Sequence, residues 1–349
     1  MDRKEDRLLR VGEREQGIGI VDCLSTGFEK VNGMLWVLLF PVAMGLFLWR
    51  GPQLSAAPAI GSLMSWYVRA LPPGALDGDA GAGALAGGAQ GAEQMQDMLA
   101  VLGDLNLFSF MTLGVCIAGR GSVPGPPLGG GLPLLALPAI SQPLWTLVLA
   151  IALYGLGLLL GAGYLGFIAQ RVRGEVTSLR RLGRGVCRSW LSMAGFLLAL
   201  LLATFAASIP TALLLGLTFA FAAEAVPVVF AVSVAVWQVA GIWLTVFTFF
   251  LVDAVIVGAL GPLNAVKSSV RLVGRNFWSA AGFVLLYLII TYGMLVIWAR
   301  LGDEPWGVAL ALLGNAYITT GLAAASMVYY RTRATALERP DAATRLAKR

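Results

Sequence analysis

The chain has 349 residues, of which 58% are hydrophobic and only 13% are charged, with a formal net charge of +6. A soluble domain of this size needs a polar surface that this composition cannot supply, so the sequence predicts an integral membrane protein. The chain has no histidine, which excludes serine–histidine chemistry and His-based zinc or haem sites.

The N-terminal segment, residues 1–33, carries six basic and seven acidic residues. A secretory signal peptide instead begins with a short basic stretch. We therefore expect the first apolar run to remain in the mature protein. That run, residues 34–50, contains Pro41 and is short for a transmembrane helix, but it is the predicted first span.

Six runs approach the length of about 20 apolar residues that a spanning helix needs. They are too long for the strands of a membrane barrel, which alternate over about ten residues. The sequence thus predicts an all-α polytopic protein with six transmembrane helices, the last five within residues 143–330. The runs are Met34–Trp49, Pro143–Ile168, Trp190–Ala222, Val226–Val257, Phe277–Trp298 and Trp306–Tyr330.

A long loop, residues 51–142, separates the first two predicted spans and is expected to be external. Two stretches rich in Gly, Ala and Pro read as linkers around a helical segment. Residues 105–118 are apolar but too short to cross the bilayer as a helix. We expect them to form an interfacial or re-entrant cap, because a seventh span would abolish the charge asymmetry of the loops.

The Lys and Arg residues predict the orientation of the chain, because basic loops stay in the cytoplasm. In a six-helix arrangement, 21 of them lie on one side and four on the other, namely Arg50, Arg69, Arg120 and Arg300. Both termini, including the tail at residues 331–349, are therefore expected on the cytoplasmic side of a bacterial inner membrane. The positive net charge is then a topology signal and gives no reason to expect nucleic acid.

Three stretches share a glycine followed by apolar residues 2, 5, 9 and 12 positions later, beginning at Gly19, Gly174 and Gly261. The later two also align at an offset of 87, and seven of fifteen residues in 188–202 and 275–289 are identical. The pattern predicts three parallel repeats, each an interfacial helix followed by two spans. The apolar positions are Val21, Leu24, Phe28 and Val31; Val176, Leu179, Gly183 and Val186; and Leu263, Val266, Val270 and Val273.

Basic residues at steps of four accompany the last two repeats and lie along one helix face in each. Such a helix is expected at the cytoplasmic interface, with its cations at the lipid headgroups or on a protein partner. The alternative is that the cations only fix the topology. In the first repeat, Ser25 and Glu29 stand at two of these positions. The predicted contact residues are Arg180, Arg184 and Arg188, and Lys267, Arg271 and Arg275.

Three polar residues fall inside predicted spans: Asp253, Gln238 and Asn315. A carboxylate in the membrane is by default a candidate for a proton or ion path, although Asp253 lies near a helix end and can instead reach interfacial partners. For Gln238 and Asn315 we expect interhelical hydrogen bonds. Gly161, Gly163 and Gly166 spell a dinucleotide motif, but they end an apolar helix, where small residues favour close packing.

Residues 261–290, GPLNAVKSSVRLVGRNFWSAAGFVLLYLII, resemble the membrane-domain family associated with glycerophosphoryl diester phosphodiesterases and its stand-alone bacterial relatives. The resemblance rests on Ala265 to Trp278, a short basic helix before a span, and implies a six-helix membrane domain. Phosphodiesterase activity in the fused relatives belongs to a separate soluble barrel, for which this chain has no room. An acidic residue that the family often has near Gly258 is missing.

These observations favour a non-catalytic membrane scaffold or accessory protein that needs no cofactor or metal. Its expected partners are membrane lipids and a possible protein on the cytoplasmic face. The alternative is a transporter or permease subunit with Asp253 near the translocation path. An enzyme is disfavoured because the sequence shows no nucleophile paired with a general base, no paired carboxylates and no cysteine cluster.

Overall fold

The computed structural model describes residues 19–51, 54, 57–70, 107–108, 110–111, 142–175, 179–301 and 305–346. Over these residues the chain forms helices and no strand. Five helices are long and apolar enough to cross a membrane, and a sixth span results if two helices joined by a 90° bend are counted together. The predicted all-α polytopic membrane protein is confirmed.

The bent pair lies at the start of the described chain. Helix α2 (Ile20–Asn32) begins at Gly19, whose backbone N–H donates to the Asp22 carboxylate at 2.9 Å. That carboxylate also compensates the positive end of the helix dipole. The chain turns by 90° at the end of α2 and enters the next apolar segment.

The predicted first span is less regular than a single helix. It consists of a 3-10 turn, η1 (Leu35–Leu38), followed by the 12-residue helix α3 (Leu39–Arg50). Pro41 lies in the first turn of α3, where backbone N–H groups have no acceptor within the helix. Because α3 begins at Leu39, the missing N–H of Pro41 costs no hydrogen bond within the helix.

The next long helix is α8 (Pro143–Arg173), which ends at Gly174 in the left-handed conformation that glycine favours, at φ +74°. Gly157 of α8 lies directly against the backbone of Met111, because a Cβ on Gly157 would be 1.9 Å from the Met111 carbonyl oxygen. Of the glycines in the dinucleotide-like motif, Gly161 is buried, and a Cβ on Gly163 would be 4.0 Å from Val186. The shorter helix α4 (Ala57–Ala70) also contacts α8.

Most of the predicted external loop, and of the predicted cap at 105–118, lies outside the described residues. Within the described part, the Leu107 N–H donates to the Leu54 carbonyl at 2.8 Å, and both side chains are buried. Phe108 packs edge-on against Phe47 of α3, with ring centroids 5.5 Å apart. These residues join the loop to the end of the first apolar segment.

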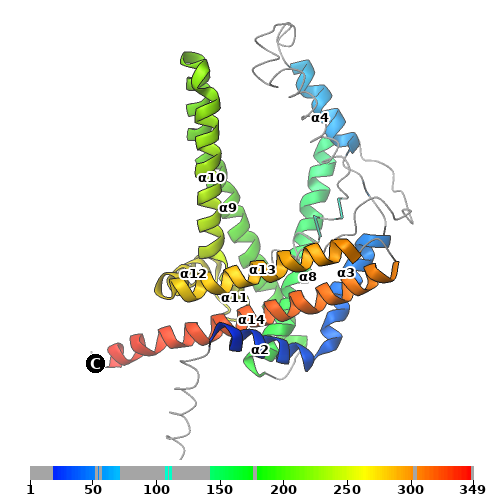
Figure 1. Ribbon diagram of the computed structural model, residues 1–349, viewed down its shortest axis with the longest axis vertical. Helices are drawn as coiled ribbons and strands as arrows, with labels where there is room; N and C mark the ends of the chain where they lie inside the picture. The colour runs from blue at the N-terminus through cyan, green and yellow to red at the C-terminus, as the bar shows by residue number, and fades with distance from the viewer. Residues whose placement is uncertain are drawn as a thin grey trace, which may run out of the picture.

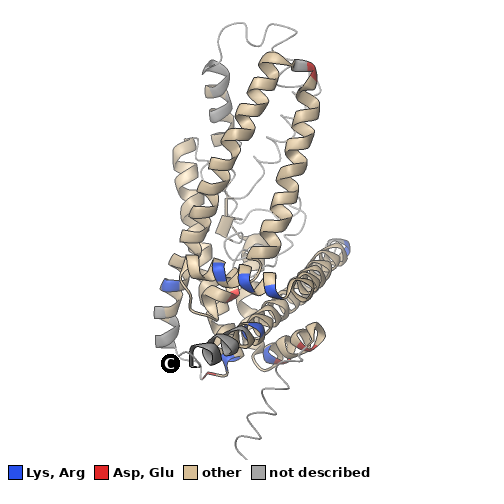
Figure 2. Ribbon diagram, turned by 90° about the vertical axis from the view of Figure 1, so that its left-hand side faces the viewer, with Lys and Arg blue, Asp and Glu red and all other residues tan. Residues whose placement is uncertain are grey.

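Helices α9 (Leu179–Phe221) and α10 (Val226–Thr248), linked by the short turn η2 (Ala223–Ala225), form a hairpin that projects from the rest of the chain (Figure 1). None of the described residues of α10 is buried. Figure 2 shows the hairpin almost free of charge, with the Lys and Arg residues gathered mainly below it. Such a uniformly apolar hairpin is suited to contact with lipid.

After the hairpin come α11 (Leu251–Ile256), α12 (Pro262–Arg275), α13 (Phe277–Leu301) and α14 (Pro305–Leu346). In Figure 1, α13 and α14 run side by side across the lower ends of α8, α9 and α10. The α13–α14 pair therefore has a different direction from the α9–α10 hairpin. The crossing region contains the main core.

Helix α2 lies along α14 and contacts it more extensively than any other helix does. A Cβ on Gly27 would be 2.5 Å from the backbone nitrogen of Ala325, so the two backbones approach as closely as small residues allow. At the end of α2, the Tyr317 hydroxyl donates to the Asn32 side chain at 3.0 Å. α2 is thus packed on another helix rather than isolated in the interface.

Helices α2 and α12 bury the same positions when residues are counted from the glycine that precedes each helix. Positions 4, 8 and 12 are buried in both: Cys23, Gly27 and Val31 in α2, and Ala265, Ser269 and Val273 in α12. The two helices also begin beside aligned glycines. A Cβ on Gly195 of α9 would be 3.9 Å from Pro262, and one on Gly282 of α13 would be 3.3 Å from Ile20.

The centre of the core is a set of packed aromatic rings contributed by α13, by α14 and by the turn between α10 and α11. The rings of Phe283 and Tyr329 are 4.8 Å apart, and those of Phe250 and Tyr329 are 5.1 Å apart. All three side chains are buried. Offset aromatic pairs of this kind add specific packing free energy to that of the buried area.

Candidate functional site

The basic residues of α12 remain exposed although the helix is firmly attached to the protein. Lys267, Arg271 and Arg275 are all exposed. On the other side of the helix, Ser269 is buried, and its hydroxyl donates to the Phe247 carbonyl of α10 at 2.7 Å. The packed face and the charged face are therefore separate, and the cations are available to a ligand outside the protein.

Large apolar side chains stand beside this charged face. Leu263 is 74% exposed and Trp278, just after the helix, is 86% exposed. Ser268 holds the remaining edge of α12 through a 2.8 Å hydrogen bond between its hydroxyl and that of Tyr330. Exposed apolar residues next to cations on a short helix are the arrangement of a membrane-surface helix.

The second predicted basic row lies in the first turns of α9. Arg188 is exposed, whereas the side chains of Arg180 and Arg184 lie outside the described residues. We expected a separate interfacial helix here, but α9 runs without interruption from Leu179 to Phe221. At the aligned position in the third repeat, Asn276 leaves helical geometry with φ −127° and so separates α12 from α13.

A second polar region forms where the ends of α8 and α11 meet α14. The Arg173 guanidinium donates to the carbonyl of Ile256 at 3.0 Å and also to that of Val257. Arg331 of α14 donates to the carbonyl of Val172 in α8. Each arginine thus satisfies carbonyl groups at a helix end and compensates its negative dipole.

Asp253 lies within this junction. It is 2% exposed, and its carboxylate accepts a hydrogen bond from the Ser326 hydroxyl at 3.2 Å. The chain leaves regular helix at Phe249 and Phe250, between α10 and α11, just before this carboxylate. Discontinuous helices next to a buried ionisable group occur at ion and substrate sites of transporters. The same contact also serves simply to join α11 to α14.

The structure separates the other two predicted intramembrane residues. Asn315 is buried in α14, as expected for a residue that bonds between helices. Gln238 is exposed on α10, and an interhelical bond for it stays a prediction. Its neighbour Trp237 makes the contact with α9, where its indole N–H donates to the Thr211 hydroxyl at 3.3 Å.

Sequence reasoning missed Arg173, Arg331 and Ser326 as members of this junction. The first two were counted only as topology signals, yet each lies at the end of an apolar run, where helix carbonyls need donors. That position was the available signal. Nothing in the local sequence marks Ser326, whose role depends on α11 packing beside it.

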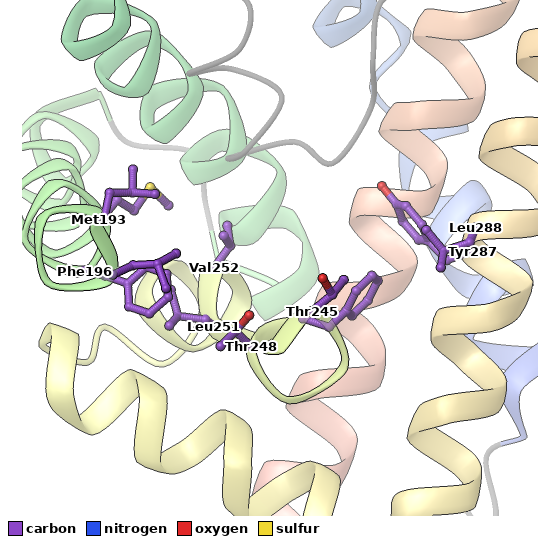
Figure 3. Close-up of a pocket in the computed structure, with 11 residues that line it drawn as sticks. Met193, Phe196, Thr245, Thr248, Leu251, Val252, Tyr287 and Leu288 are labelled. Atoms are coloured by element: carbon purple, nitrogen blue, oxygen red, sulfur yellow. The ribbon is translucent and has the colours of Figure 1, made fainter. Parts of the chain in front are cut away.

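A cavity of about 330 Å³ opens between α9, α10, α11 and α13 (Figure 3). Its walls are apolar apart from a few hydroxyl groups. Those of Thr245 and Thr248 already donate to the carbonyls of Gly241 and Leu244, at 2.8 and 2.7 Å. Most of the surface of the cavity therefore suits hydrocarbon.

Over the described part of the chain, no three His, Cys, Asp or Glu side chains come together as a metal site requires. Comparison with protein-family models, with curated proteins and with solved structures finds no match. The site must therefore be interpreted from its own chemistry.

Proposed function

We propose that the protein is a non-catalytic scaffold or accessory protein of a bacterial inner membrane, which uses basic helix faces to engage anionic lipid headgroups or a cytoplasmic partner. One observation carries the proposal: Lys267, Arg271 and Arg275 are exposed on α12 while its opposite face is buried in the protein. A helix held in this way presents its cations without further ordering.

The free energies involved are sufficient for lipid enrichment. Each cation near an anionic leaflet contributes about 1 kcal/mol, so the three on α12 supply roughly 3 kcal/mol. Arg188 of α9 adds a fourth exposed cation. These cations belong to the larger group of Lys and Arg residues on one side of the predicted spans. That asymmetry favours a cytoplasmic location for both termini.

We further propose that the chain consists of three parallel repeats. The shared buried positions of α2 and α12, and the placement of their first residues beside Gly282 and Gly195, support this interpretation. Helices α2 and α12 then pack on the repeat that precedes each of them in this arrangement, α12 beside Gly195 of α9 and α2 on α13 and α14. The resemblance of residues 261–290 to the phosphodiesterase-associated membrane domains agrees with a helical membrane domain.

The test compares lipid retention by the protein in nanodiscs of phosphatidylglycerol and phosphatidylcholine, measured by native mass spectrometry. Neutralising Lys267 and Arg271 together, as Lys267→Gln with Arg271→Gln, should weaken phosphatidylglycerol retention by about 2 kcal/mol, or roughly 30-fold. Arg300→Gln is the matched control, because Arg300 is also exposed but lies at the far end of α13. Unchanged retention in the double variant would reject the headgroup interaction.

A transporter subunit is the second candidate, and the buried Asp253 beside the break between α10 and α11 favours it. In this case Asp253 would exchange a proton or cation during transport. Proton flux into proteoliposomes, followed with an entrapped pH dye, should then disappear in Asp253→Asn. Absence of flux in the unaltered protein, or flux that survives the substitution, contradicts a proton path through this carboxylate.

A further inference from the structure

Gln238 is a polar side chain near the middle of the apolar hairpin that α9 and α10 form (Figure 1). About 18 Å of helix separates it from the start of α10 at Val226. Its side chain is exposed, and no group among the described residues forms a hydrogen bond with it. At this depth in a hydrocarbon core about 30 Å thick, there is no water to take the place of a partner.

The nearby hydroxyl groups of the hairpin are engaged elsewhere. The Thr211 hydroxyl of α9 accepts from the indole of Trp237, the residue before Gln238. Ser208 and Thr218 of α9 donate to carbonyls of their own helix at 2.7 and 2.8 Å. Lipid tails offer neither a donor nor an acceptor, and an amide without a hydrogen bond is unfavourable in hydrocarbon. The position of Gln238 therefore calls for a polar group from outside the chain.

The residues that share a helix face with this amide suit the close approach of another helix. Ala231, Val234, Gln238 and Gly241, which we call the Gln238 face, are spaced by three, four and three residues, as in the seam of a left-handed helix pair. All four are exposed. A Cβ on Gly241 would meet nothing within 4 Å, so no contact among the described residues requires a glycine there. Small residues at this spacing let two membrane helices pack closely.

The Gln238 face is separate from the side of α10 that packs on α9. That side contains the half-buried residues Val229, Ser233 and Trp237, which recur every four positions. Because successive residues of an α-helix are turned by about 100°, these three lie about a third of a turn from the Gln238 face. A further helix can therefore lie on the Gln238 face without displacing α9.

A second copy of the chain supplies the complementary group at the right depth. An amide carries both a donor and an acceptor, so two glutamines on facing helices satisfy each other. Copies in one membrane share one orientation, so their α10 helices run parallel and their Gln238 side chains lie level. A two-fold axis along the membrane normal then places each residue of the Gln238 face opposite its own counterpart.

We propose that two copies of the protein associate through the Gln238 face, with the two Gln238 amides hydrogen-bonded to each other. The Gln238 face belongs to the charge-free part of the hairpin, whereas the exposed cations of α12 lie below it (Figure 2). The pairing of two copies and the binding of headgroups therefore use different surfaces. Each can be lost without the other.

Disulfide crosslinking of the full-length protein in native membranes tests the pairing. Replacing the two other native cysteines by serine leaves only the buried Cys23 as background. In this protein, Ala231→Cys and Val234→Cys should each give a species of doubled mass on oxidation, because each new thiol faces its counterpart. Val232→Cys and Val239→Cys are the matched controls and should give little of it. Both controls change residues that are more than half exposed, at 58% and 54%, on another side of α10.

Substitutions on the Gln238 face then measure its contribution, with the dimer counted by single-molecule photobleaching in vesicles over a range of lipid dilutions. Gln238→Leu should weaken the dimer roughly tenfold, the contribution typical of an interhelical amide bond. It removes no contact within the described residues, so the fold should persist. Gly241→Ile should abolish the dimer by keeping the helices apart. Gly216→Ile on α9 is its control, because a Cβ on Gly216 also meets nothing within 4 Å.

Equal crosslinking from all four cysteine positions, or a monomer at every lipid dilution, would overturn the proposal. A dimer that Gln238→Leu and Gly241→Ile leave unchanged would also reject it, because the contact would then lie on another surface. If Ala231→Cys crosslinks to a different protein and gives no species of doubled mass, the occupant of the Gln238 face is not a second copy.

Discussion

Phe196 on α9 and Phe283 on α13 occupy the same place in two stretches that share seven of fifteen residues. Phe283 is 1% exposed and touches three other aromatic rings, whereas Phe196 is half-buried at the edge of a cavity. Equivalent sequence therefore produces equivalent orientation but not equivalent packing. The difference comes from the partners, because Tyr329 of α14 and Phe249 and Phe250, just before α11, surround the ring of Phe283, whereas a cavity remains beside Phe196.

The largest expected effect is on stability and tests this contrast directly. Phe283→Ala should lower the free energy of unfolding by about 3 kcal/mol, because it opens a void in a closely packed core. Phe196→Ala should cost only about 1 kcal/mol, since the residue already borders empty space. Unfolding in mixed micelles measures both, and the exposed pair Leu198→Ala and Leu285→Ala provides the control.

Similar costs for Phe196→Ala and Phe283→Ala would mean that the α9 face is as tightly packed as that of α13, and the comparison would fail. A large cost for either exposed leucine would show instead that the helix surfaces, not the inward faces, determine stability. The two outcomes can be told apart because the four variants form two aligned pairs, one on the inward faces of α9 and α13 and one on their exposed faces.

An intermediate effect on stability is expected for the hydrogen bond between the hydroxyl groups of Tyr329 and Ser279. Tyr329 donates to the Ser279 hydroxyl at 2.9 Å, and the Tyr329 ring is fully buried. Ser279→Ala should destabilise the protein by about 1–2 kcal/mol, because it leaves a buried donor without its acceptor. Tyr329→Phe removes that donor, so the double variant should lose less than the sum of the two single changes.

The sequence predicted much of the helical order because membrane spans and basic rows are encoded locally. The apolar runs located the long helices, and the steps of four placed Lys267 and Arg271 on an exposed face. These features need no knowledge of which helices are neighbours.

Other features depend on neighbours and could not be predicted. Gln238 is exposed on a helix none of whose described residues is buried. Arg173 and Arg331 reach carbonyls in other helices, which no local spacing indicates. The cavity beside Phe196 is bounded by four helices that are distant in the sequence, so its position depends on how they pack and not on either stretch of sequence.

The smallest expected effect does not involve stability. It is a difference in the accessibility of two cysteine thiols, one at the start of α9 and one on α2. Cys187, next to Arg188 at the start of α9, is exposed, whereas Cys23 of α2 is 1% exposed beneath α14. Burial raises the pKa of the Cys23 thiol to about 11; Arg333 lowers it slightly and Asp22 raises it further. Because the thiolate is the reactive form, Cys23 should stay inert until the pH approaches 11.

The chain has a third cysteine, Cys116, which the substitution Cys116→Ser removes. In that variant, a membrane-impermeant maleimide at pH 7.5 should modify Cys187 and not Cys23, as counted by mass spectrometry. Labelling of Cys187 only from the cytoplasmic face of inverted vesicles would agree with the predicted orientation of the α9 start. Rapid modification of Cys23 would show that α2 leaves α14 readily, and the first helix would then be a mobile interfacial element rather than the packed counterpart of α12. Modification of both cysteines after denaturation provides the control that each thiol is free.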